Sequence, residues 1–285
     1  MQELNKPTTF SFFGISWRHA LLLVIVAGSL AFMLSMQPFG QNPNYHHFAD
    51  SRVFFGVSNF FDVMSNIPFL LVGMAGISFC LGNRLMCLRS AWFTFFAGVA
   101  IVSTGSAYYH WNPNNETLVW DRLPMTIGFM GLFVALLAEY VSARLAGFLL
   151  VPALLVGFSS VIYWYWFDDL RFYYWIQLIP LLIVPAVILL FRPKYSHQWL
   201  LLLALAFYIL AKISEAYDRE VFAFSQSFIS GHSLKHLLAA SGCFSVLVML
   251  KSRSSVDDGG LRGHPIINLS SENNALSREI KGSGH

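Results

Sequence analysis

The sequence predicts an all-α membrane protein with eight transmembrane helices. Of its 285 residues, 56% are hydrophobic and only 12% are charged, whereas soluble domains carry about 25% charged residues. The apolar runs approach the roughly 20 residues that a helix needs to cross a bilayer. A net charge of +3 is too small to favour nucleic acid as a partner, so the lipid bilayer is the expected surrounding.

The first half of the chain supplies four spans. The first, about 18–37, stops before Pro38, and its apolar run is too long for the core of a cleaved signal peptide. The second, about 58–81, begins with several polar residues, and the third, about 90–110, closes with S-A-Y-Y-H. After a short loop, 111–120, the fourth span, about 121–143, opens with D-R-L-P-M.

The second half supplies four more spans, about 147–167, 172–191, 197–215 and 232–250. Aromatic residues crowd the loop between the fifth and sixth spans, as in the aromatic belts of membrane interfaces. Residues 1–17 form a cytoplasmic N-terminal segment and residues 18–250 one transmembrane domain. The Ser-, Gly- and Asn-rich residues 251–285 are expected to be a disordered cytoplasmic tail.

Lysine and arginine gather at one set of loop ends, which predicts the orientation because cytoplasmic loops are enriched in these residues. An even number of spans then puts both termini in the cytoplasm. The inner ends carry Lys6, Arg18, Arg84, Arg89, Arg144, Arg192, Lys194, Lys251 and Arg253, against Arg52, Arg122, Arg171 and Arg219 at the outer ends.

His232 and His236 stand four residues apart at the head of the last span, so both imidazoles can share one helix face. The predicted topology brings His110 and Asp121 to the same membrane face, and Ser106 lies one turn before His110. Three imidazoles with one open position are typical of a catalytic zinc site. Zinc would acidify water and polarise a carbonyl.

In that site Asp121 is expected to transfer protons and Ser106 to orient water or donate to an oxyanion. Structural alternatives remain: Asp121 as a helix N-cap, Ser106 as a packing serine, and the histidines as interfacial residues. His46 and His47 are interpreted as loop residues. Further polar residues in or beside the spans are expected to pair inside the bundle, with Lys212 facing Glu139 or Glu215; they are Asp62, Asn66, Glu139, Lys212, Glu215 and Asp218.

This pattern resembles the alkaline ceramidase family, and more widely the seven-helix membrane hydrolases that include the progestin and adipoQ receptors. The similar strings are S106-x3-H110, D-R-L-P-M from Asp121, H232-x3-H236, and N-F-F-D-V-M-S-N from Asn59, and they cover about residues 45–250. The resemblance implies a seven-helix core with the first helix as an addition, in a bacterial-type member of the inner membrane.

By the same resemblance His110, His232 and His236 would bind zinc, and Ser106 and Asp121 would assist a zinc-activated water. The implied reaction is hydrolysis of the amide of a ceramide-like sphingolipid to sphingoid base and free fatty acid. The sequence departs from the family at its calcium site, where Asn59 replaces an acid. This departure leaves Asp50, Asn59 and Asp62 as a weaker set of candidate calcium ligands.

Three other functions are compatible with parts of the pattern. A zinc-dependent hydrolase of another membrane lipid would use the same site. A lipid receptor would hold zinc as a closed structural site without an open position. A transporter fits least, because the polar residues gather at one membrane face and no inverted repeat is visible.

Overall fold

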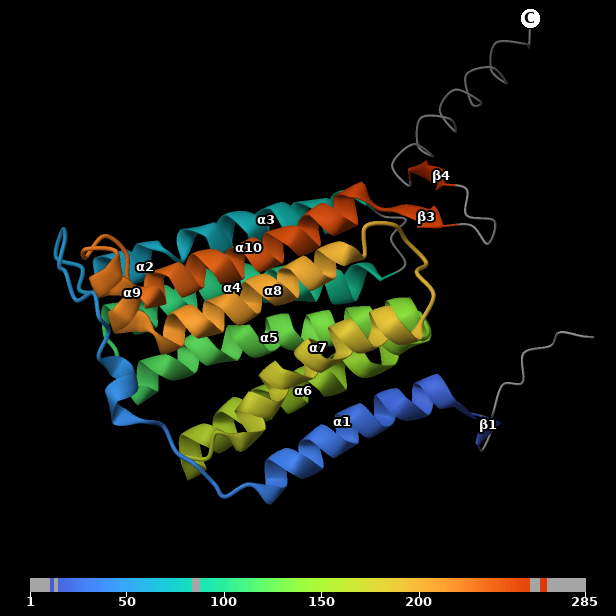
Figure 1. Ribbon diagram of the computed structural model, residues 1–285, viewed down its shortest axis with the longest axis horizontal. Coiled ribbons are helices and arrows are strands. Elements are labelled where there is room, and N and C mark those ends of the chain that lie inside the picture. Colours follow the sequence, from blue (N-terminus) through green and yellow to red (C-terminus); the bar gives the residue numbers. More distant parts are fainter. Residues whose placement is uncertain (1–10, 13–14, 84–87, 257–261, 266–285) are drawn as a thin grey trace, which may run out of the picture.

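In the part of the chain that the structure describes, the protein is helical apart from two short hairpins, and eight helices are long and apolar enough to cross a membrane. A computed structural model describes residues 11–12, 15–83, 88–256 and 262–265. The helices lie side by side in one bundle, with α1 along one edge (Figure 1). The spans are α1 (Trp17–Ser35), α2 with α3 (Phe60–Met64, Ile67–Gly82), α4 (Arg89–Trp111), α5 (Asn115–Tyr140), α6 (Arg144–Phe167), α7 (Arg171–Leu190), α8 (Trp199–Ala216) and α10 (Gly231–Ser252).

Shorter elements lie at the ends of the bundle. The 3-10 helix η1 (Pro43–His46) follows α1, and the helix α9 (Asp218–Phe224) joins α8 to α10. Antiparallel strands β1 (Ser11–Phe12) and β2 (Ile15–Ser16) precede α1, while β3 (Ser254–Val256) pairs with β4 (Arg262–Pro265) after α10. The sequence did not predict these hairpins. Most of the predicted disordered tail, 257–261 and 266–285, lies outside the described residues.

The fourth span begins earlier than predicted. α5 starts at Asn115 because Asn114 caps it. Oδ1 of Asn114 accepts from the backbone amide of Thr117, and Oγ1 of Thr117 accepts from the backbone amide of Asn114. This reciprocal capping box satisfies two amides that a helix start leaves unpaired. Asp121 therefore lies inside the second turn of α5, so its interpretation as an N-cap was wrong, and the loop predicted over 111–120 shrinks to three residues, 112–114.

Close backbone contact between α4 and α5 sets the positions of the residues at their adjoining ends. A Cβ on Gly105 would lie 2.1 Å from the carbonyl oxygen of Trp120, and one on Gly98 would lie 2.4 Å from the amide nitrogen of Gly128. Only glycine allows helices to approach so closely, a device that is common between membrane helices. The contact keeps the end of α4 beside the start of α5, where His110 and Asp121 lie.

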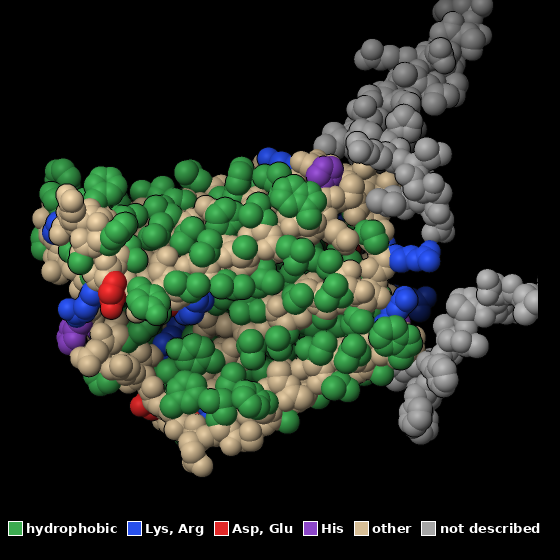
Figure 2. All heavy atoms as spheres, in the orientation of Figure 1, with side chains coloured by type: hydrophobic (Ala, Val, Ile, Leu, Met, Phe, Trp, Pro, Cys, Tyr) green, Lys and Arg blue, Asp and Glu red, His purple; other side chains and the backbone are tan. Residues whose placement is uncertain are grey.

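The outer surface is apolar along the helices. Large hydrophobic side chains such as Leu71, Phe148 and Leu189 are 65%, 76% and 82% exposed. Figure 2 shows hydrophobic side chains over the middle of one face, with charged side chains mostly toward its two ends. Soluble monomers rarely expose apolar surface so widely, and this surface suits the hydrocarbon of a lipid bilayer.

One buried ion pair lies at the end of the bundle away from the histidines. Nη1 of Arg253 donates to Oε2 of Glu139 at 2.6 Å, and both side chains are 6% exposed. Lys212 pairs instead with Glu215 on its own helix. Of the two partners predicted for Lys212, the structure thus selects Glu215 and gives Glu139 to Arg253.

Candidate metal centre and polar cavity

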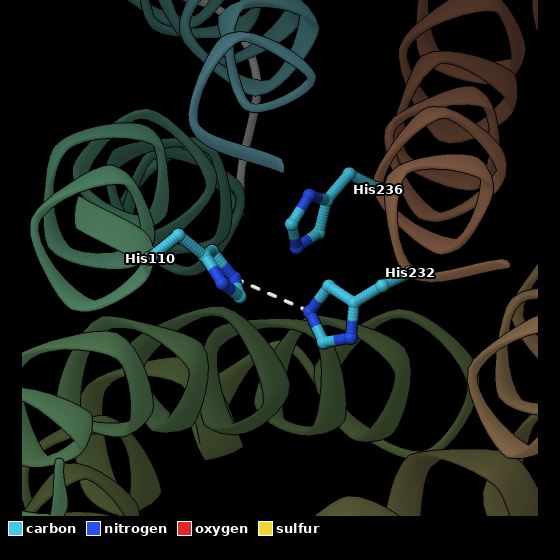
Figure 3. A group of neighbouring side chains, drawn as sticks. All are labelled: His110, His232 and His236. Carbon is cyan, nitrogen blue, oxygen red and sulfur yellow. Dashed lines mark hydrogen bonds between the residues drawn. The ribbon is translucent and has the colours of Figure 1, made fainter. Parts of the chain in front are cut away.

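The three histidines predicted to bind zinc come together at one end of the bundle. His110 lies in the last turn of α4, and His232 and His236 lie in the first two turns of α10. Their rings point toward a shared centre (Figure 3). All three residues are almost fully buried, with 0% to 3% of their surface exposed. The shared helix face that the i,i+4 spacing predicted is confirmed.

The ring nitrogens are spaced as metal ligands are. Nε2 of His110 lies 3.2 Å from Nε2 of His232, and one nitrogen from each ring lies within 4.8 Å of the others. Two nitrogens on one tetrahedral zinc, each at roughly 2.0–2.1 Å, are about 3.3 Å apart. Nδ1 of His110 is buried without a hydrogen-bond partner among the described residues. The donor set fits a divalent metal that accepts imidazole, and is compatible with zinc without being specific for it.

Ser65, at the break between α2 and α3, sets the tautomer of His236. Its hydroxyl donates to the carbonyl oxygen of Asp62 at 3.0 Å, and its Oγ lies 2.7 Å from Nδ1 of His236. A hydroxyl has one hydrogen, so Nδ1–H of His236 must donate to Ser65. A neutral imidazole carries one N–H, which leaves Nε2 of His236 with a free lone pair facing the other two rings.

Two carboxylates hold the N-terminus of α10. Oδ1 of Asp62 accepts from the hydroxyls of Ser230 and Ser233 at 3.0 and 2.6 Å. Oδ1 of Asp218 accepts from the backbone amide of His232 at 2.8 Å. Negative charge at a helix N-terminus satisfies free amides and complements the helix dipole. These contacts fix the first turn, and so the direction in which His232 points.

Gly231 is required by the packing of the same turn. A Cβ at this position would lie 2.1 Å from the carbonyl oxygen of Ser214 and 2.6 Å from Cα of Asp218. The glycine before His232 therefore lets α10 begin directly against the junction of α8 and α9.

Lys235 lies next to the histidines, although the sequence did not single it out. Its Nζ donates to Nε2 of His232 at 2.7 Å and to Oε1 of Glu215 at 3.0 Å. Glu215 also pairs with Lys212 and accepts from the hydroxyl of Tyr45 at 3.0 Å. Burial, followed by the charge of Glu215, raises the pKa of the Tyr45 hydroxyl well above its usual range. This network places the positive charge of Lys235 beside Nε2 of His232, the nitrogen that would bind the metal.

A cavity lined by His236 also has both predicted catalytic residues in its wall. Its polar end, about 70 Å³, is lined by Ser106, Asp121 and His236 together with charged and aromatic side chains. A larger apolar cavity of about 150 Å³ shares several lining residues with it and extends between α4, α5, α7, α8 and α10. The shared residues are Phe69, Val102, Met125, Tyr208 and Ala239. A polar group at the histidines and an apolar chain farther inside could thus occupy adjoining spaces.

The loop after α1 covers this end of the bundle. His46 contacts the hydroxyl of Tyr109 and Oδ1 of Asn115, each at 3.0 Å, and the ring of Phe48 lies 4.7 and 4.6 Å from the rings of His110 and His232. Burial lowers the pKa of His46. His46 and Phe48 therefore belong to the cover of the site, and His47 is exposed beside them.

The three candidate calcium ligands each have separate partners. Asp50 binds Arg52 through both carboxylate oxygens, at 2.8 and 2.5 Å. The side-chain amide of Asn59 donates to the carbonyl oxygen of His110 at 2.8 Å. Asp62 accepts from the serines at the start of α10. Among the residues that the structure describes, the group of side chains with metal-ligand spacing is the histidine cluster.

Compared with models of protein families and with curated proteins, the chain matches none. The geometry of the site therefore provides the basis for a functional proposal.

Proposed function

We propose that the chain is a zinc-dependent intramembrane amidase that hydrolyses ceramide-like lipids to sphingoid base and free fatty acid. The observation that supports this most directly is the buried cluster of His110, His232 and His236, of which His236 lines a polar cavity that shares residues with a larger apolar one. In soluble metalloenzymes such a three-histidine set leaves a coordination position for chemistry.

Zinc held by the three histidines would supply Lewis acidity toward the amide carbonyl and lower the pKa of water toward neutrality. Asp121 lies on the same cavity wall, and none of the ion pairs among the described residues includes it. Without a cation at ion-pair distance, its carboxylate can take a proton from water and deliver it to the leaving nitrogen. The water oxygen adds to the carbonyl carbon and the C–N bond breaks.

Ser106 would act on the same carbonyl group. It is 2% exposed and lines the polar end of the cavity one helical turn before His110. From that position its hydroxyl can orient water or donate to the oxygen on which negative charge develops. The apolar cavity would take part of a hydrocarbon chain.

We place the chain in a bacterial inner membrane, and the arrangement of charges supports an orientation with both termini in the cytoplasm and the site at the outer face. Arg89, Arg144, Arg192 and Lys251 lie at the ends of the spans opposite to the histidines, and inner ends are the ones enriched in basic residues. α1 packs on α7 at the edge of the bundle, which suits an added helix beside a seven-helix core. Reporter fusions at each terminus test this orientation.

The reaction is tested with purified protein and a set of ceramides, by measuring released fatty acid. We expect about one zinc per chain, and expect a chelator or His232→Ala to abolish hydrolysis. His47→Ala, which removes an exposed histidine near the same face, should leave both zinc and activity unchanged. Hydrolysis that survives the chelator and His232→Ala would refute the metal mechanism.

Metal content and substrate separate the alternatives. Loss of zinc in His110→Ala with no ceramide turnover in the wild type would favour a hydrolase of another lipid, to be identified by screening acyl esters and other amides. Zinc with no open coordination position, measured by X-ray absorption, would favour a receptor.

A further inference from the structure

Arg122 is a buried cation in the wall of the polar cavity. It follows Asp121 on α5, is 4% exposed, and lines the cavity together with Lys212 and Lys235. From the sequence alone, Arg122 was interpreted only as a positive charge at the outer end of a span.

The contacts of Arg122 hold its guanidinium in place without neutralising it. Nη2 donates to Oε1 of Gln41 at 2.5 Å. The guanidinium carbon lies 3.9 Å from the ring centre of Trp164 and 4.8 Å from that of Tyr173. These aromatic rings favour a cation and restrict its plane. Nη1 is buried and has no hydrogen-bond partner among the described residues.

Three arginines of the described chain pair with a carboxylate, and they include Arg253, the other buried arginine among the described residues. Arg52 pairs with Asp50, Arg171 with Asp169, and the buried Arg253 with Glu139. Within the described residues no carboxylate lies within 4.0 Å of the Arg122 guanidinium.

Cationic side chains outnumber carboxylates among the described residues that line the cavity, and one of the cations, Lys212, is 43% exposed. Lys212 and Lys235 share the Glu215 carboxylate, and Asp121 is the other acid on the wall. Three cationic side chains thus face two carboxylates. Buried charges in membrane proteins are usually paired, because an unpaired ion is costly away from water. A buried guanidinium with an unpartnered N–H, in a residue that lines a cavity, is suited to a two-oxygen anion.

We propose that Arg122 binds an anionic group, a carboxylate or a phosphate, of the lipid held in this cavity. The inference rests on the proposed function in taking the ligand to be a lipid. Two sources share this chemistry: a phosphate in the headgroup of the substrate, or the carboxylate of the fatty acid that hydrolysis releases.

The test compares matched lipids that differ in one anionic group. Binding to the purified protein in neutral detergent, with zinc removed by chelator so that no turnover occurs, is measured by native mass spectrometry and thermal shift. One pair is ceramide 1-phosphate against ceramide, and the other is palmitate against hexadecanol. We expect the anion of at least one pair to bind about tenfold or more tightly than its neutral counterpart, as hydrogen bonds to charged groups allow.

Substitutions then assign the preference to Arg122. Arg122→Gln should abolish it, and Arg122→Lys should retain only part, because lysine lacks the planar fork. Arg219→Gln removes an exposed arginine at the same end of the bundle and should leave the preference intact. A preference in the phosphate pair alone identifies a headgroup, and one in the fatty-acid pair alone identifies the product.

Equal binding of anionic and neutral lipids by the wild type would overturn the inference, whether or not the Arg122 variants fold. So would a preference that persists in Arg122→Gln. Failure of the proposed hydrolysis is a separate result, because ceramide turnover can be absent while the anion preference and its dependence on Arg122 remain.

Discussion

Replacing Ser65 by alanine should weaken zinc binding although Ser65 is not itself a ligand. In the wild type Nδ1–H of His236 donates to the Ser65 hydroxyl at 2.7 Å, so Nε2 is free to bind metal. Without the hydroxyl, metal-free His236 can change tautomer. Metal binding through Nε2 would then require an N–H on Nδ1 that has lost its Ser65 partner, in a residue that is 3% exposed.

The size of this effect follows from the cost of one buried unsatisfied donor, about 1–3 kcal/mol. Because this cost falls on the metal-bound state, zinc affinity should fall about 10- to 100-fold, in the range known for hydrogen-bond partners of metal ligands. The measurement is a competition titration of purified Ser65→Ala against a chelator of known zinc affinity.

Two variants serve as controls for Ser65→Ala. Ser65→Thr keeps the hydroxyl and should bind zinc nearly as the wild type does. Ser241→Ala removes a hydroxyl on α10 that donates to the Leu237 carbonyl of the same helix, and it should not change the zinc affinity. An affinity of Ser65→Ala within about twofold of the wild type would refute the tautomer assignment.

Three further predictions concern other contacts. Lys235→Met should bind zinc about tenfold more tightly, since Nζ no longer competes for Nε2 of His232; the same titration checks this, and weaker binding would contradict it. Glu139→Gln leaves Arg253 buried without its ion pair, so the free energy of unfolding should fall by about 3–5 kcal/mol. The measurement is a lower melting temperature. The double variant Glu139→Met, Arg253→Met should largely restore it. Because burial lowers the pKa of His46, the unfolded chain binds more protons than the folded one as pH falls through about 6.5. The stability that neutral His46 contributes above about pH 6.5 is thus lost on acidification. His46→Gln should therefore flatten the fall in melting temperature between about pH 7 and 5. An unchanged dependence of melting temperature on pH would show that His46 does not contribute.

Local pattern was sufficient for the helices and for part of the site. Apolar length located the eight spans, and the i,i+4 spacing of His232 and His236 predicted their shared face. The topology drawn from positive charges brought His110 to them across 122 residues. The start of α5 was missed although its signal was readable: Asn114 and Thr117 have capping-box spacing.

Tertiary contacts account for what the sequence could not predict. Ser65 meets His236 across 171 residues, and a serine in an apolar run has no local mark of such a role. In the sequence, Lys235 is an ordinary charged residue between two histidines. The structure shows that it donates to Glu215, 20 residues earlier, and this contact keeps it inside the bundle. From the sequence, Arg122 served only to predict the membrane topology. Its contacts show a buried guanidinium with no carboxylate partner among the described residues.

The hydrogen bonds between Asp62 and two serines at the start of α10 have a consequence for biosynthesis. Its carboxylate is fully buried, and its Oδ1 accepts from Ser230 and Ser233, which follow it by 168 and 171 residues. Chains are made from the N-terminus onward, so Asp62 enters the bundle long before these partners exist. Until α10 inserts, the nascent protein carries an acid without these donors among its early helices. A chain truncated before Ser230 would lack both donors permanently, so an unfinished molecule differs from a finished one in the hydrogen bonding of a buried acid.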